Sequence, residues 1–266
     1  MHRKAGEIVR RQGFTLVELS IVLVIIGLLI GGILVGQSLI DSSKITAQVR
    51  QIQQLDIATN NFIRKYKALP GDSGKFDYPG NNDGILLDST GIQSNYSGEI
   101  MNVWSHLTKT EMLNFYKHNN NDGITAYGAA ITPGLNCPKA VIGERATILG
   151  MTSAGTIFPL NTPIWHIRRN FVEGAHLFDG NNTRGQSSPL TIMEAASVDN
   201  KMDDGNAIAG DVRASDGKRT GQQWASGATE QGCVLAADNS KYDINLTTVG
   251  ASERPCGLVF KMQIAK

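Results

Sequence analysis

The chain has 266 residues, of which 41% are hydrophobic and only 6% are aromatic. Its 25 lysines and arginines nearly balance 24 aspartates and glutamates, and the net charge of +1 indicates no strong affinity for nucleic acid or acidic surfaces. The histidines are scattered, and there is no Walker loop, H-E-x-x-H or G-x-S-x-G pattern. We therefore expect a protein that is not an enzyme.

The N-terminus is the most informative segment. A leader with four basic residues precedes an apolar run, residues 14–36, whose only charged residue is Glu18. About 20 apolar residues span a bilayer as a helix, and basic flanks stay on the cytoplasmic side. The pattern predicts one membrane-spanning segment with a cytoplasmic N-terminus and the rest of the chain outside.

A cleaved secretory signal is the alternative interpretation of this segment. Such a signal has a core of about 7 to 15 apolar residues, no acid within it and a small-residue cleavage site after it. Here the core is longer, contains Glu18 and continues into residues 36–40 without an A-x-A site. We therefore favour a retained membrane helix.

The residues Gly13-Phe14-Thr15-Leu16-Val17-Glu18 resemble the processing site of type IV prepilins and of type II secretion pseudopilins. The resemblance covers residues 10–66 and implies a leader peptide, residues 1–13, that prepilin peptidase removes between Gly13 and Phe14. It also implies N-methylation of Phe14 and a role for Glu18 in assembly, paired with the Phe14 ammonium of a neighbouring subunit. The alternative is that Glu18 reaches toward lipid headgroups at the membrane interface.

Beyond the membrane run, apolar residues recur at spacings of three and four, which predicts an amphipathic helix with one buried face. These residues are Ile45, Val49, Ile52, Leu55, Phe62, Ile63 and Tyr66. We expect one nearly continuous helix over residues 14–67, ended by the Leu69-Pro70-Gly71-Asp72 segment. A globular head over residues 68–266 follows, in the periplasm or outside the cell.

The head is expected to contain both helices and strands. Helices are predicted over residues 98–115, with a break near Thr110, and over residues 191–202, where Thr191 and Glu194 have capping-box spacing. Strands are predicted over residues 146–149, 156–158, 164–168, 234–236 and 258–264, the last as a half-buried antiparallel strand with alternating apolar residues. The fold class is therefore α+β, a long N-terminal helix on a small antiparallel sheet with a loop-rich head. The resemblance implies the same pilin-like fold.

Three other segments resemble a subgroup of prepilins with a large head. They are Leu69-Pro70-Gly71-Asp72, Trp104-Ser105-His106-Leu107 and residues 198–205.

Three clusters rich in asparagine and aspartate end in Asp-Gly, at residues 81–84, 119–123 and 199–205. Oxygen-rich loops suit calcium, but Asn and Gly also suit tight turns. We favour turns for the first two clusters. For the third, calcium and a turn both remain open, and the calcium candidates are Asp199, Asp203, Asp204 and Asp211. Met202 occupies a position that should supply an oxygen ligand in an EF-hand loop. The resemblance nevertheless implies calcium, because some pseudopilins bind it through acidic loops. No cofactor is required.

Three cysteines, Cys137, Cys233 and Cys256, are expected to face an oxidising periplasm, where disulfides form. Cys233 and Cys256 flank the C-terminal strands and are the favoured pair, similar to the C-terminal staple of many pilins. Pairing with Cys137 is the alternative, because the sequence alone does not define connectivity.

Together these features predict a structural subunit of a type IV pilus or of a type II secretion pseudopilus. The expected location is the bacterial inner membrane before assembly, and the periplasm or cell exterior afterwards. The expected partners are prepilin peptidase, copies of the chain, other pilins or pseudopilins, and an inner-membrane assembly platform with its ATPase. A minor tip pilin whose head binds a ligand or secreted substrate, and a monomeric membrane-anchored adhesin, are the alternatives.

Overall fold

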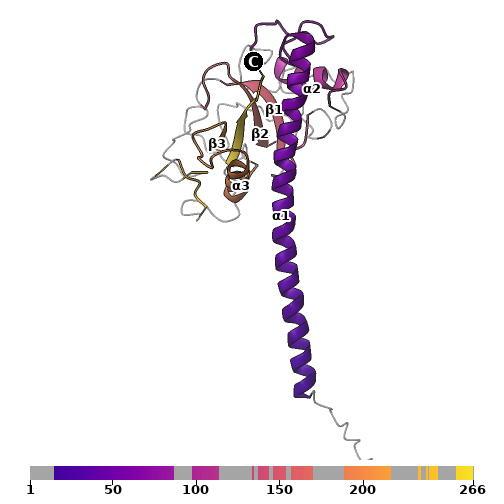
Figure 1. Ribbon diagram of the computed structural model, residues 1–266, viewed down its shortest axis with the longest axis vertical. Coiled ribbons are helices and arrows are strands. Elements are labelled where there is room, and N and C mark those ends of the chain that lie inside the picture. The colour runs from indigo at the N-terminus through magenta and orange to yellow at the C-terminus, as the bar shows by residue number, and fades with distance from the viewer. Residues whose placement is uncertain are drawn as a thin grey trace, which may run out of the picture. The chain divides into compact units, whose positions relative to one another are not determined.

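The computed structural model describes residues 15–86, 98–113, 134, 137–143, 146–153, 157–169, 189–216, 233–234, 238, 240–244 and 256–265. The chain divides into two compact units, Met1–Ser43 and Lys44–Lys266. Helix α1, Leu16–Tyr66, contributes residues to both units (Figure 1). The predicted long helix is therefore present, but the boundary between the units lies inside it and not at its end.

In the first unit, α1 presents apolar side chains on every side. Each large apolar residue from Ile21 to Ile30 is at least 46% exposed. Its length and composition are sufficient to cross a membrane. A helix that is apolar all round needs an apolar environment, either lipid or other helices.

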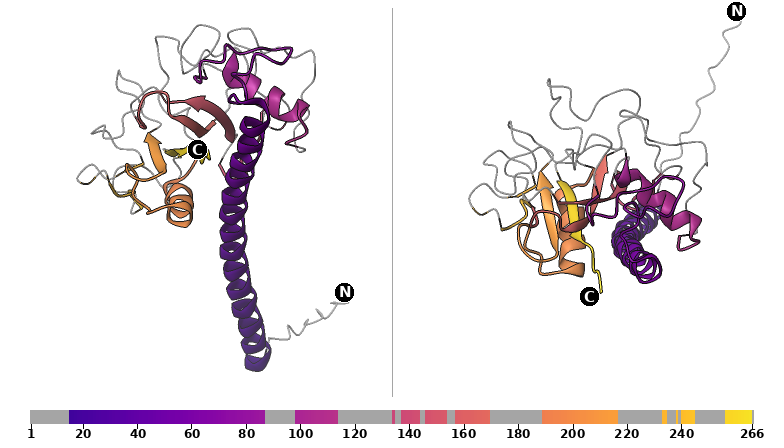
Figure 2. Two further views of the ribbon diagram at one scale, coloured as in Figure 1. Left: turned by 45° about the horizontal axis from the view of Figure 1, so that its top comes forward. Right: turned by 90° about the horizontal axis from the view of Figure 1, so that it is seen from above.

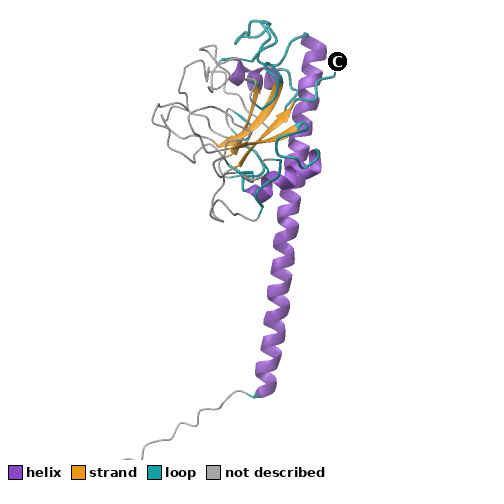
Figure 3. Ribbon diagram, turned by 90° about the vertical axis from the view of Figure 1, so that its left-hand side faces the viewer, coloured by secondary structure: helices purple, strands orange, loops and turns teal. Residues whose placement is uncertain are grey.

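The second unit contains a four-stranded sheet in which all neighbouring strands are antiparallel (Figure 3). Its strands are β1, Ala146–Thr152; β2, Pro163–Arg169; β3, Val212–Asp216; and β4, Cys256–Lys261. They lie in the order β1-β2-β4-β3, so the last strand of the chain is inserted between two earlier ones. The predicted α+β fold class is confirmed.

Two short helices cover the sheet. Helix α2, Glu99–Lys109, packs against β1, and helix α3, Ile192–Met202, packs against β3 and β4 (Figure 2). The capping box predicted for α3 is present, with the Glu194 N–H donating to the Thr191 hydroxyl and the Glu194 carboxylate accepting from the Thr191 N–H. The helix predicted over residues 98–115, with a break near Thr110, ends at Lys109 with Thr110 as its C-cap, and residues 114–115 lie outside the described residues.

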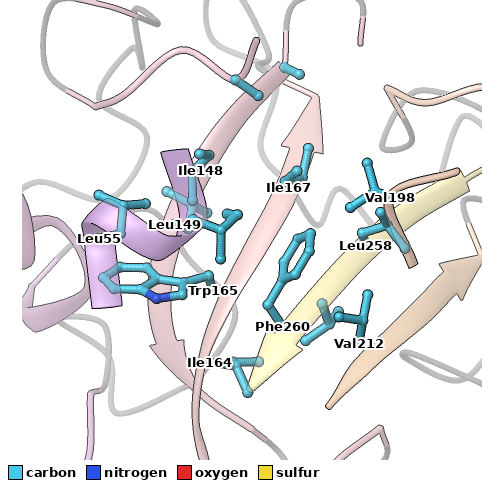
Figure 4. Close-up of a cluster of buried hydrophobic side chains, with 14 of the residues drawn as sticks. Leu55, Ile148, Leu149, Ile164, Trp165, Ile167, Val198, Val212, Leu258 and Phe260 are labelled. Carbon is cyan, nitrogen blue, oxygen red and sulfur yellow. The ribbon is translucent and has the colours of Figure 1, made fainter. Parts of the chain in front are cut away.

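The core of the second unit joins the second half of α1 to the sheet. Leu55 of α1 lies beside Trp165 of β2, and Val198 of α3 lies beside Leu258 of β4 (Figure 4). Of the predicted helix stripe, Ile45, Ile52, Leu55 and Phe62 are buried, and Val49, Ile63 and Tyr66 are partly buried. The amphipathic pattern therefore identified the buried face of α1.

Several strand predictions need correction. Ile157 and Phe158 lie in a bend, where the Arg213 guanidinium lies 4.4 Å from the Phe158 ring centre and donates to the Ile157 carbonyl. These apolar residues were predicted as a strand, yet they are buried by packing against a side chain and not by strand pairing. Val234 forms an isolated bridge with Tyr242, and residues 235–236 lie outside the described residues.

The final strand also differs from its prediction. β4 ends at Lys261, and side chains on both of its faces are buried, so Val259 is as buried as Leu258. Beyond the strand, the backbone turns to α1: the N–H of Gln263 donates to the Asp56 carboxylate and the N–H of Ala265 donates to Asn60. Strand β3 was not predicted at all.

Candidate assembly helix and its carboxylate

The start of α1 is closed by a capping box between Thr15 and Glu18. The Glu18 Oε2 accepts from the Thr15 N–H at 2.8 Å and from the Thr15 hydroxyl at 2.9 Å, and the Glu18 N–H donates to the Thr15 hydroxyl at 3.2 Å. These bonds satisfy backbone donors that have no partner within a helix. Gly13 and Phe14 lie outside the described residues.

The sequence contained a signal for this capping box that our prediction did not use. Thr15 and Glu18 have the same T-x-x-E spacing as Thr191 and Glu194 in α3. Glu18 therefore has a local role in helix capping, independent of any neighbouring subunit or headgroup.

The Glu18 carboxylate also keeps capacity for a further partner. Both of its bonds to Thr15 use Oε2, and within the described residues Oε1 accepts no hydrogen bond. A charged carboxylate in hydrocarbon costs about 2.5 to 3.5 kcal/mol on insertion scales. An ammonium group near Oε1 would reduce that cost.

Four glycines in the first unit, Gly27, Gly31, Gly32 and Gly36, leave the helix surface open. A Cβ at any of these positions would meet no atom within 4 Å. Gly27 with Gly31, and Gly32 with Gly36, have the spacing that allows close approach of helices in lipid. This part of α1 can therefore contact other helices closely.

Residues 8–34 match the prokaryotic N-terminal methylation motif. This motif is consistent with the type IV prepilin and pseudopilin family. It contains Gly13, Phe14 and Glu18, the residues on which the resemblance depended. No curated protein and no solved structure matches the chain.

The second half of α1 holds the head through polar contacts as well as packing. Gln48 is buried in α1, and its side-chain oxygen accepts from the N–H groups of Val141 at 2.8 Å and Ile142 at 3.3 Å. The Trp165 indole N–H donates to Asp56 at 2.8 Å. Burial raises the pKa of Asp56, while this indole bond opposes the shift.

The head gathers three of the four predicted calcium ligands. One carboxylate oxygen from each of Asp199, Asp203 and Asp204 lies within 4.8 Å of the others. Burial raises the pKa of Asp199 to about 6, although hydrogen bonds from Tyr242 and the Gly205 N–H oppose this shift.

The fourth candidate, Asp211, has other partners. Its carboxylate accepts from Lys261 at 3.1 Å and from Gln263 at 3.0 Å, and these bonds lower its pKa. Asp211 therefore has partners near the end of β4 and is not part of the group formed by Asp199, Asp203 and Asp204.

The cluster at residues 81–84 forms a turn around a buried carboxylate. The two oxygens of Asp72 accept from the N–H groups of Asp83 at 3.1 Å and Gly84 at 2.9 Å. Asn82 and Gly84 have positive φ values, as such a turn requires. Asp72, Asp83 and Glu99 form a second group of acids that our prediction missed, because Asp72 and Glu99 are distant in sequence. The cluster at residues 119–123 lies outside the described residues.

A disulfide joins Cys233 and Cys256, the pair favoured from the sequence, with 4.9 Å between their Cα atoms. Cys137 is a buried free thiol whose sulfur lies 2.7 Å from the Thr147 hydroxyl oxygen. Burial raises the pKa of the Cys137 thiol to about 12, so it is not a thiolate at neutral pH.

His106 has a structural environment. Its Nδ1 accepts from the Gly71 N–H at 2.9 Å, and its Nε2 lies 2.9 Å from the Tyr78 carbonyl, so the proton is on Nε2. Its ring stacks on Phe62 and Phe76. Burial lowers the pKa of His106 to about 4, and the neutral ring fastens α2 to the loop after α1.

Proposed function

We propose that the protein is a structural subunit of a type IV pilus or a type II secretion pseudopilus. The observation that carries this proposal is the contrast within α1 behind a methylation motif. Residues 16–40 expose their apolar side chains, whereas the segment from Ile45 to Phe62 is packed into a globular head. Monomeric soluble proteins rarely expose apolar surface on this scale, so the first segment needs lipid and then neighbouring helices.

The proposed sequence of events begins in the bacterial inner membrane. The chain spans the membrane once, with its basic leader in the cytoplasm and its head outside. Prepilin peptidase cuts between Gly13 and Phe14, and Phe14 is then methylated. The assembly platform and its ATPase then move the mature chain into a periplasmic pseudopilus or an extracellular pilus.

Glu18 acts in this assembly through its charge. In the membrane monomer its Oε2 caps α1 through Thr15. In the filament its carboxylate pairs with the Phe14 ammonium of a neighbouring subunit, and each charge offsets the burial cost of the other. The capping bonds support this role because they set the position of the carboxylate before assembly.

The decisive experiment is intact-mass and N-terminal peptide analysis of the membrane protein, with and without prepilin peptidase. The proposal predicts a mature chain that begins at methylated Phe14 only when the peptidase is present. Gly13→Val should block the cut, whereas Gly6→Val, the same change within the leader, should not. A chain that keeps its leader, or is cut after residue 36, would contradict the proposal.

The amount of protein in sheared filaments then separates a major subunit from a tip subunit. A major subunit should dominate the preparation, whereas a tip subunit that binds a ligand or secreted substrate should be nearly absent. Normal surface display of the Glu18→Ala variant would instead indicate a membrane-anchored monomer that does not polymerise.

A further inference from the structure

A segment without helix or strand follows β4 and lies against the second half of α1. It comprises residues 262–265, which we call the C-terminal strap. Each backbone N–H group of the strap donates a hydrogen bond, in chain order to Pro163, Asp56, Met262 and Asn60. Residues near a chain end are usually poorly ordered unless they are tied down. The complete pairing of these N–H groups therefore identifies the strap as a fastened segment.

Asn60 of α1 holds the strap by its main chain. Its Nδ2 donates to the Gln263 carbonyl, and its Oδ1 accepts from the Ala265 N–H at 2.8 Å. A side-chain amide has one donor end and one acceptor end, and here each end pairs with the complementary backbone group. The side chains of Gln263 and Ala265 are exposed. Asn60 therefore holds the strap through its backbone groups and not through these side chains.

Asp56, one turn earlier in α1, connects the strap to the sheet. Its Oδ1 accepts from the Gln263 N–H at 3.3 Å and from the indole N–H of Trp165 at 2.8 Å. Trp165 belongs to β2, so a single oxygen atom connects α1, β2 and the strap. A displacement of the strap should therefore change the surroundings of the Trp165 indole.

The strap fastens a part of α1 that other polar contacts do not reach. Among the described elements, α2 approaches β1, and α3 approaches β3 and β4, more closely than α1 approaches any strand. The side chains of Thr46, Gln48 and Gln51 hold α1 to α3 and to residues 139–142. Asn60 lies nine residues beyond Gln51, about 14 Å along the helix. The strap is thus a separate attachment nearer the C-terminal end of α1.

The strap has the features of a segment that opens before the core does. Its hydrogen bonds to Asp56 and Asn60 are exposed. Met262 is buried and Ile264 is partly buried, whereas the neighbouring β4 is paired with strands on both sides. Segments with exposed hydrogen bonds and few buried apolar contacts open at a lower free energy than the core.

We propose that the C-terminal strap is a conformational switch that opens as a local unit and, when closed, fixes α1 to β2 through Asp56. In the closed state, α1 and the sheet move as one body near Asp56. In the open state, α1 keeps its apolar packing but loses the strap, so the helix can shift against β2 while the head stays folded. The switch goes beyond the filament role and does not depend on it, because every contact that it uses lies within the head.

Hydrogen exchange of the full chain in detergent micelles, followed by nuclear magnetic resonance, tests the proposal. In the wild-type protein, the Ala265 N–H should exchange at least tenfold faster than the N–H groups of β4, because the strap opens without global unfolding. Asn60→Ala removes both bonds to the strap main chain and should speed exchange of the Ala265 N–H by roughly tenfold. The Trp165 indole N–H should also exchange faster, by a smaller factor.

Two controls separate the strap from general loosening of the head. Asn61→Ala makes the same change at the next residue, which is exposed, and should leave both exchange rates unchanged. The Trp104 indole stacks on Trp165 but has no hydrogen-bond partner in the described residues. Its exchange rate should stay the same in Asn60→Ala.

A truncated chain that ends at Met262 completes the test. It lacks the bonds of Gln263 and Ala265, so its Trp165 indole N–H should exchange faster than in the full chain. Adding Asn60→Ala to the truncated chain should cause no further increase, because Asn60 acts through the strap.

Three outcomes would overturn the proposal. The first is an Ala265 N–H that exchanges as slowly as the N–H groups of β4, which would mean that the strap does not open by itself. The second is an equal effect of Asn60→Ala and Asn61→Ala. The third is a Trp165 indole whose exchange is unaffected by the truncation, or is accelerated by Asn60→Ala as much in the truncated chain as in the full one.

Discussion

The two halves of α1 have the same backbone conformation but opposite surroundings. Leu29 in the first half is 60% exposed, whereas Leu55 in the second half is fully buried against the sheet. The first half has no buried stripe because it is apolar on all sides, and the second has one because polar residues alternate with apolar ones. The first half of the helix therefore needs an apolar environment, either lipid or other helices, and the second half needs the head of its own chain.

The capping boxes extend this comparison. Thr15 with Glu18, and Thr191 with Glu194, make the same local bonds. The first box lies in the unit whose apolar side chains are exposed, and the second lies in the packed head. Loss of the same hydrogen bonds should therefore lower the head's free energy of unfolding only at the second box. The following predictions test this difference, beginning with the largest expected effect.

Glu18→Gln should abolish filament assembly while leaving the head folded. Removing one partner of a buried ion pair costs about 3 to 5 kcal/mol, because the other charge is left uncompensated. The amount of protein in sheared filaments, compared with the membrane fraction, measures the effect. Glu194→Gln is the matched control, since it disturbs the same box in α3 without an assembly role. Normal filaments from Glu18→Gln would disprove the pairing.

Leu55→Ala should destabilise the head by about 2 to 5 kcal/mol, through lost burial and the cavity left behind. Leu29→Ala removes the same atoms from the same helix, but should leave the head's free energy of unfolding unchanged. Denaturant unfolding of the full chain in detergent, followed by near-UV circular dichroism of the stacked Trp104 and Trp165, measures both changes. Equal effects would show that the two halves form one cooperative unit.

His106 should make the head less stable as pH falls from about 6.5 to about 4. Its pKa is lowered to about 4 in the fold, so in this range the unfolded chain takes up a proton that the native ring refuses. The contribution lost over this range is about 3 kcal/mol. Below about pH 4 no further loss is expected from this group.

The measurement compares wild type with His106→Gln across this pH range. Asp199 titrates in the same range with the opposite sign, because its raised pKa favours the native state at low pH. Its effect is common to both proteins and cancels in the difference. The cost of the substitution should shrink as pH falls, and a constant cost would contradict the assigned role.

Thr191→Ala should destabilise the head by about 1 kcal/mol, the usual cost of losing an N-cap. Thr15→Ala breaks the same kind of cap in the first unit and should not change the head's unfolding. The same dichroism experiment compares them. A loss of stability with Thr15→Ala would mean that the N-terminal end of α1 is coupled to the head.

The sequence predicted the parts of the fold that depend on local patterns. The bounds of α1 and α3 came from hydropathy, spacing and the Thr191 cap. Strand β3 escaped prediction because its sequence, Val-Arg-Ala-Ser-Asp, has little strand character of its own. It is a strand because it pairs with β4, which lies about 40 residues later in the chain.

The candidate sites divide in the same way. Gly13, Phe14 and Glu18 are recognisable because a processing motif is contiguous in sequence, and residues 8–34 match the methylation motif. The acid cluster was only partly predictable. Sequence spacing brought Asp211 into the candidate set, but in the fold Lys261 at the end of β4 and Gln263 just beyond it lie against its carboxylate.

By itself, the sequence determined the N-terminal methylation motif and the apolar first half of α1, because a linear motif and continuous hydrophobicity need no tertiary contacts. Only the tertiary structure decided the strand order, the contact between Asp56 and Trp165, and which acids meet beside Tyr242. These features join residues far apart in the chain. Their partners are selected by packing of the whole core, which no local pattern encodes.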